Sequence, residues 1–214
     1  MRKGITRFLV CTEQSHQLSI DMTLQEKLKA ATSSEHDQLE TQMFVGQIMS
    51  KMLSIEQYNK ILMTNYLIHA SYEEMLCSTI PADLAKTLNL EERKKLKALE
   101  KDLLQAELAP AVVVTPNNRN WTLWSALGAM YVLEGATLGG KVIYKQLLAN
   151  PNFTNSRLDL NYYNIYGDQL MAKWTQFVAI LNSVKEEHHQ EVIDGAKAMF
   201  NEISQKAQEA VAAV

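Results

Sequence analysis

The sequence predicts an all-α protein, built as a single-domain helical bundle. Apolar residues recur at helical spacing along most of the chain after residue 20. No segment alternates apolar and polar residues over the length of a strand, and no internal repeat or low-complexity stretch is present. At 214 residues the chain can bury a substantial core, and we assign the domain to residues 21–214.

Residues 1–20 are predicted to be a poorly ordered extension. Arg2, Lys3 and Arg7 precede a short apolar run, as at the start of a signal peptide. That run ends at Thr12, well short of the roughly 7–15 apolar residues that a signal peptide needs. Elsewhere no stretch of about 18 apolar residues occurs without a charge, so no membrane span is expected.

Charge and cysteine content exclude several classes of function. The formal net charge is −3, and no block of lysine and arginine offers a surface for nucleic acid. The two cysteines, Cys11 and Cys77, lie in unrelated segments. This predicts neither a disulfide scaffold nor a zinc cluster, and it fits a protein of the reducing cytoplasm.

Three helices are expected in the first half of the domain, over residues 23–46, 54–79 and 90–108. Ser54 and Gln57 form the sequence pattern of a capping box at the start of the second. In the third, the charged residues 91–95 are interpreted as a solvated face over three leucines. Residues 109–120 are a connection, because they hold two prolines and three asparagines.

The second half begins with the most apolar helix, residues 121–150, which is apolar nearly all round before Glu134. Such a helix is typical of a central element. Two further helices are predicted over residues 162–183 and 185–210.

His36 lies on the apolar stripe of the first predicted helix. Glu40 follows one turn later and Lys29 lies two turns earlier, so the three side chains project in roughly one direction. An imidazole with a carboxylate for its other nitrogen and a nearby cation suits an axial metal ligand beside an anionic cofactor. The alternative is a core histidine next to a surface glutamate.

The central helix contains three glycines within six residues, Gly135, Gly139 and Gly140. Each costs about 1 kcal/mol relative to alanine in a helix interior. Close helix packing accounts for one or two of them, whereas three favour a flat ligand that approaches the backbone. A kink of the helix there is also expected.

Other groups of reactive residues are weaker candidates. Residues 186–189, Glu-Glu-His-His, supply only one Glu-x-x-His pair, whereas a di-iron bundle needs two, so we interpret them as a polar surface turn. Cys77 on an apolar face is interpreted as a small core residue rather than a nucleophile.

Four segments together resemble the bacterial heme oxygenases, in family order and over roughly residues 23–205. They are LKAATSSEH at 28–36, HASYE at 69–73, YVLEGATLGG at 131–140, and the run from Tyr166-Gly167 to WTQF at 174–177. The combination of the upstream histidine with Leu-Glu-Gly-x-x-Leu-Gly-Gly is the specific part of the resemblance.

The resemblance implies that heme is held between a proximal helix with His36 and a distal helix with Gly135, Gly139 and Gly140. His36 would be the axial ligand of the heme iron, supported by Glu40. Lys29 would lie near the heme propionates, and Lys173 would be a second such cation. The three glycines would form the catalytic surface of the distal helix, next to heme and dioxygen.

The implied reaction is the oxidative cleavage of heme to biliverdin, carbon monoxide and ferrous iron. Heme would be both cofactor and substrate, with electrons from a reductase or a ferredoxin. Animal members carry an acid at the position of Ala136, so proton delivery here would use backbone groups and water, with His69 or Tyr66 as helpers.

Two other functions remain open at this point. One is a heme carrier of the same fold that does not turn heme over. The other is a relative that acts on a different small molecule, such as a thiamin-pyrimidine hydrolase, which would need Cys77 as nucleophile.

Overall fold

Helices supply all the regular secondary structure of the described residues, which are 22–109, 119–154 and 158–213 of the computed structural model. The all-α prediction is therefore confirmed. The extension predicted over residues 1–20 lies outside the described residues. Among the helices described, none is both long enough and apolar enough to cross a membrane.

The N-terminal part of the bundle is broken into three short helices where the sequence predicted one. They are α1 (Leu24–Ala31), α2 (Ser33–Gln42) and α3 (Val45–Met49). The first break is at Thr32, whose hydroxyl donates to the carbonyl oxygen of Leu28 at 2.8 Å. A side chain that bonds this acceptor bends the helix locally. The second break is at Phe44, which has a positive φ of 55°.

The next helix, α4 (Ile55–Thr79), begins as predicted. The Ser54 hydroxyl accepts from the Gln57 amide, and the Gln57 side chain accepts from the Ser54 amide, which completes the capping box. A short helix that was not predicted, α5 (Ala82–Leu88), follows Pro81.

The predicted helix over residues 90–108 is wrong as a single element. A 3₁₀ turn, η1 (Leu90–Arg93), is followed by extended backbone at Lys94, and α6 (Leu96–Gln105) starts only after Lys95. The interruption turns Arg93 and Lys95 into the protein, where both are buried.

The central helix α7 (Leu123–Leu148) runs without interruption through the three glycines that the sequence singled out. It packs most closely against α9 (His189–Ala213). A Cβ atom at Gly128 would lie 1.9 Å from the carbonyl oxygen of Val192, and one at Gly195 would lie 2.1 Å from that of Ser125. The two backbones meet at this crossing because neither glycine carries a side chain.

The last predicted pair of helices is confirmed with shifted boundaries. Residues 162–166 form turns, so α8 (Leu170–Asn182) begins eight residues later than expected. Three further 3₁₀ turns complete the chain: η2 (Pro151–Phe153), η3 (Gly167–Gln169) and η4 (Glu186–His188).

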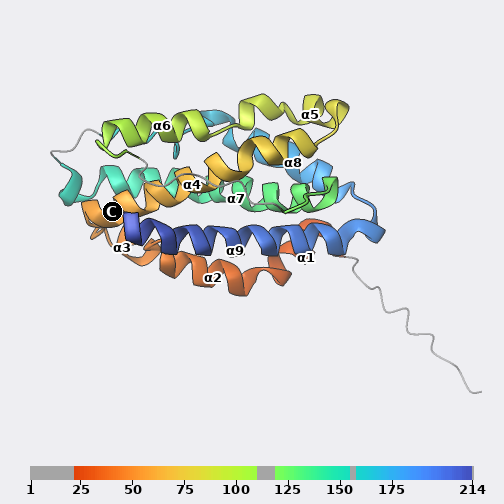
Figure 1. The fold of residues 1–214 in the computed structure, drawn as a ribbon, viewed down its shortest axis with the longest axis horizontal. Helices are drawn as coiled ribbons and strands as arrows, with labels where there is room; N and C mark the ends of the chain where they lie inside the picture. Colours follow the sequence, from red (N-terminus) through yellow and green to blue (C-terminus); the bar gives the residue numbers. More distant parts are fainter. Residues whose placement is uncertain (1–21, 110–118, 155–157, 214) are drawn as a thin grey trace, which may run out of the picture.

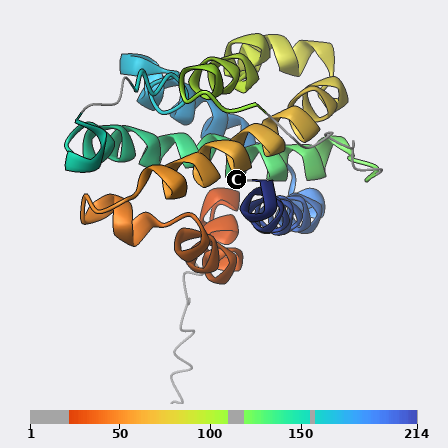
Figure 2. The ribbon, with the colours of Figure 1, turned by 60° about the vertical axis from the view of Figure 1, so that its left-hand side comes forward.

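Figure 1 shows α7 in the middle of the bundle, with α5, α6 and α8 on one side and α9 and α2 on the other. Turned by 60°, the same arrangement shows α4 crossing α7 (Figure 2). Helices α2 and α7 both pack against α9 and against α3. Within the described residues, α2 and α7 make no extensive contact with each other.

Candidate functional site

His36 lies on α2 with 59% of its side chain exposed to solvent. It is therefore neither the buried core histidine nor a ring that faces the core. Its ring makes an edge-to-face contact with Phe200 of α9, with 6.2 Å between centroids. The contact with α9 fixes one side of the imidazole and leaves much of the ring accessible.

Two carboxylates flank the Nδ1 atom of this imidazole. Glu40 Oε1 is 3.6 Å from it and Asp37 Oδ1 is 4.0 Å from it. These distances exceed a hydrogen bond, but negative charge on this side favours the proton on Nδ1. The lone pair is then on Nε2, which has no partner among the described residues. An imidazole in this state is suited to bind a metal ion through Nε2.

The three glycines of α7 differ in what surrounds them. A Cβ at Gly140 would lie 3.3 Å from the backbone oxygen of Tyr163, so close packing explains this glycine. At Gly135 the nearest atom would be a ring carbon of Trp174 at 3.9 Å, and at Gly139 no atom lies within 4 Å. Packing within the described protein therefore does not require glycine at 135 or 139, and both fit the close approach of a ligand.

A buried ion network adjoins these glycines. Glu134 Oε2 accepts from Nη1 of Arg93 and Oε1 accepts from Nζ of Lys95, both at 2.5 Å. The hydroxyl of Tyr166 lies 2.8 and 3.0 Å from the two carboxylate oxygens. Burial alone would raise the pKa of Glu134, but the two cations outweigh it and the pKa is lowered.

The sequence analysis missed this network and interpreted residues 91–95 as a solvated face, which is wrong for two of them. Only 3% of Arg93 and 2% of Lys95 is exposed. One signal could have shown this. Glu134 stands alone in an apolar helix, and a buried carboxylate requires a cationic partner from elsewhere in the chain.

The two lysines predicted to hold the propionates have different surroundings. Lys29 is exposed, and no carboxylate of the described residues pairs with it. Lys173 is mostly buried, and its Nζ donates to Glu92 Oε2 at 2.6 Å. This ammonium pairs with Glu92 in the structure, and the role predicted for Lys173 toward a propionate stays a prediction.

His69, a predicted helper, is buried on α4. Its Nδ1 lies 2.8 Å from Oε2 of Glu73, and its Nε2 has no hydrogen-bond partner in the described structure. Since a carboxylate accepts, Nδ1 carries the proton. Burial lowers the pKa of this imidazole, although the bond to Glu73 opposes the shift.

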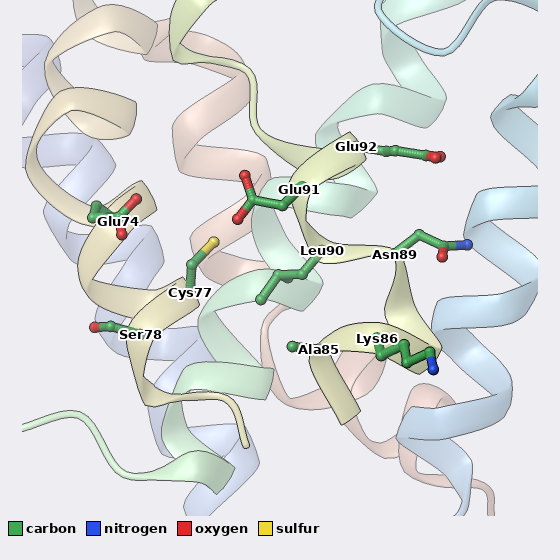
Figure 3. A pocket seen from close by; sticks show the side chains of 9 residues that line it. All are labelled: Glu74, Cys77, Ser78, Ala85, Lys86, Asn89, Leu90, Glu91 and Glu92. Carbon is green, nitrogen blue, oxygen red and sulfur yellow. The ribbon is translucent and has the colours of Figure 1, made fainter. Parts of the chain in front are cut away.

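The remaining candidates do not form reactive sites. Cys77 lines an open cavity of about 490 Å³ between α4, α5 and η1, shown in Figure 3. Burial raises the pKa of its thiol to about 11, so the thiol is protonated and a poor nucleophile. His188 stacks on Trp124, and His189 contacts Lys27 and the carbonyl oxygen of Val184.

Comparison with known proteins identifies the family. The family model for heme oxygenase matches residues 22–209, nearly the whole of the described chain. The chain belongs to the heme oxygenase family. A heme oxygenase of Xanthomonas campestris pv. campestris (strain 8004) is 27% identical over 152 residues, which are 69% of this chain and 87% of that protein.

Solved heme oxygenases share the fold. The NO- and CO-bound enzyme from Neisseria meningitidis superposes with a TM-score of 0.68 at 22% identity, over 90% of this chain and 94% of that one. Heme oxygenase-1 from the cyanobacterium Synechocystis, in complex with heme, superposes with a TM-score of 0.68 at 15% sequence identity. The match covers 88% of this chain and 92% of that one. The heme oxygenase of Leptospira interrogans superposes with a TM-score of 0.65 at 20% sequence identity, over 88% of this chain and 100% of that one.

Proposed function

We propose that this heme oxygenase family member binds heme between α2 and α7 and cleaves it to biliverdin, carbon monoxide and ferrous iron. The reaction would use dioxygen and electrons from a reductase or a ferredoxin. The observation that carries the proposal is the accessible imidazole of His36, whose Nε2 has no partner among the described residues and whose Nδ1 faces two carboxylates. We place the reaction in the cytoplasm, because the chain has only two, unclustered cysteines.

His36 would hold the heme iron through Nε2. Glu40, whose Oε1 lies 3.6 Å from Nδ1, would help to orient the ring. Lys29 would attract a propionate, because it is exposed and unpaired among the described residues. The iron held in this way would supply the site at which dioxygen binds.

On the distal side the chain would supply space rather than a functional group. Gly135 and Gly139 let the α7 backbone approach the bound molecule, since neither position is filled by a neighbour. When bound, heme supplies both the oxygen-activating iron and the carbon that is oxidised. The protein would orient the two reactants.

Protons would not come from the residue that follows Gly135. Ala136 is exposed and has no titratable group. The roles predicted for His69 and Tyr66 as helpers stay predictions. The Nε2 atom of His69 is a buried acceptor without a partner in the described structure, and its Nδ1–H is held by Glu73.

The deciding experiment is a single absorbance series. The purified protein is loaded with one equivalent of heme, reduced without oxygen, and then exposed to air with a reductase present. We expect loss of the Soret band, growth of a broad red absorption from a linear tetrapyrrole, and release of carbon monoxide. An oxygenated complex that returns to ferric heme, with neither product, would contradict the proposal and indicate a heme carrier.

A further inference from the structure

We infer that Glu134, Arg93 and Lys95 fix the position of residues 135–140 of α7, here called the glycine turn, relative to the bound heme. This position would determine which meso carbon is oxidised. The inference rests on the proposed function, since it assigns a specificity role within that site. Glu134 immediately precedes Gly135, so whatever fixes this side chain fixes the start of the turn.

The first argument is the number of bonds that converge on one carboxylate. Glu134 accepts from Arg93, Lys95 and Tyr166, which come from two segments far apart in the chain, residues 93–95 and the turn before η3. Charge-assisted bonds in a buried place are strong and strict in geometry. Burial and the neighbouring carboxylate raise the pKa of Tyr166 to about 12, so its hydroxyl keeps its proton and donates.

The second argument is that the two cations are themselves anchored to the rest of the bundle. The Nε atom of Arg93 donates to the carbonyl oxygen of Leu88, and Nη2 donates to that of Lys173 at 3.0 Å. The backbone amides of Lys95 and Leu96 donate to the Glu73 carboxylate of α4. Residues 93–96 therefore tie α7 to α4, to α8 and to the end of α5.

The third argument is that the glycine face has no comparable support of its own. A Cβ atom at Gly139 would have no neighbour within 4 Å among the described residues, and one at Gly135 would meet only a ring carbon of Trp174 at 3.9 Å. Along a helix, Gly135 and Gly139 are rotated by about 100° and 140° from Glu134. The Glu134 carboxylate thus points away from the side of α7 that carries Gly135 and Gly139. It would hold the glycine turn in place without touching heme.

The test uses Lys95→Met and Glu134→Gln, with Glu92→Gln as the matched control. Lys95→Met removes one cation but leaves the bonds of Glu134 to Arg93 and Tyr166, so this variant is expected to fold even if Glu134→Gln does not. Glu92→Gln removes the exposed partner of Lys173, which belongs to the same region but not to the Glu134 cluster.

Two measurements are made on each protein. The first is amide hydrogen exchange of residues 135–141 in the heme-free protein. We expect Lys95→Met to exchange faster there by on the order of tenfold, and Glu92→Gln to match the wild type. The second is the distribution of biliverdin isomers after complete turnover, where we expect Lys95→Met to lower the share of the wild type's main isomer.

The outcomes separate the two proposals. Wild-type exchange and an unchanged isomer distribution in Lys95→Met would overturn the positioning role. A changed distribution in Glu92→Gln of equal size would also overturn it, because the effect would not be specific to the Glu134 cluster. If the wild-type protein makes no biliverdin, the proposed function fails. In that case, unchanged amide hydrogen exchange in Lys95→Met would separately contradict the positioning role of Glu134, Arg93 and Lys95.

Discussion

The Nδ1 atom of His69 lies 2.8 Å from Oε2 of Glu73, and the same carboxylate accepts hydrogen bonds from the backbone amides of Lys95 and Leu96 at the start of α6. One acidic side chain of α4 therefore fixes the tautomer of a buried histidine and also caps a helix that has no side-chain cap of its own. Because His69 is held neutral, the fold becomes less stable in acid.

Replacing His69 should change how stability depends on pH. Its pKa is lowered in the folded protein, mainly by burial, so the unfolded chain binds the proton more readily. Stability is then fully present above the unfolded pKa of about 6.5 and falls as the pH drops below it, by up to about 1.4 kcal/mol per pH unit. Urea unfolding between pH 7.5 and 5 should show a shallower slope for His69→Gln. An unchanged slope in His69→Gln would contradict the assignment.

His36→Ala should remove the iron ligand without harming the fold, because the side chain is 59% exposed. Heme affinity should fall by at least the roughly 10–100-fold that follows loss of an outer partner of a metal ligand. The Soret band should move and turnover should largely stop, with partial return when imidazole is added. His188→Ala is the control and should bind heme as the wild type does. Full turnover by His36→Ala without imidazole would show that another residue ligates the iron.

Gly139→Val and Gly128→Ala should fail in opposite ways. A side chain at 139 enters open space, so the melting temperature of the heme-free protein should stay close to that of the wild type while heme or oxygen binding is impaired. A side chain at 128 would collide with the backbone of Val192, which destabilises the fold by about 1–3 kcal/mol or more. Calorimetry of the heme-free proteins and heme titration separate the two. Normal heme degradation by folded Gly139→Val would show that neither heme binding nor turnover requires glycine at this position.

Lys29→Met and Lys173→Met test the two predicted propionate partners. Loss of the exposed Lys29 charge should weaken heme binding by about 2–5-fold, with a smaller effect at high salt, as for a surface ion pair. Lys173→Met should leave heme affinity unchanged and lower stability, since its ammonium pairs with Glu92. Heme titrations at two salt concentrations measure the first effect, and denaturant unfolding measures the second. The reverse pattern would restore Lys173 as the propionate ligand.

Local patterns in the sequence predicted local features well. The capping box at Ser54 and the neighbourhood of His36 and Glu40 depend on residues three or four positions apart, which a helix brings together whatever surrounds it. The fold class followed from periodicity for the same reason.

Features set by distant partners could not be predicted in this way. Residues 91–95 have the composition of a solvated helix face. Arg93 and Lys95 nevertheless point inward, because both donate to the buried carboxylate of Glu134, about forty residues later in the chain. The break at Thr32 also could not be predicted, because the hydroxyl bond to the preceding turn that accompanies it occurs at Thr64 within the unbroken α4. The reason for each glycine likewise became visible only from what lies beside it.

The crossing of α9 over α7 has a consequence for how the protein is made. Helix α9 provides Phe200, which contacts His36, and Gly195, which lets the chain meet α7 at Ser125. Both walls of the proposed heme site therefore depend on a helix that leaves the ribosome after all the others described. We expect nascent chains that end before α9 to expose the apolar face of α7 and to be unable to take up heme. Cofactor loading would then be a step that follows the synthesis of α9.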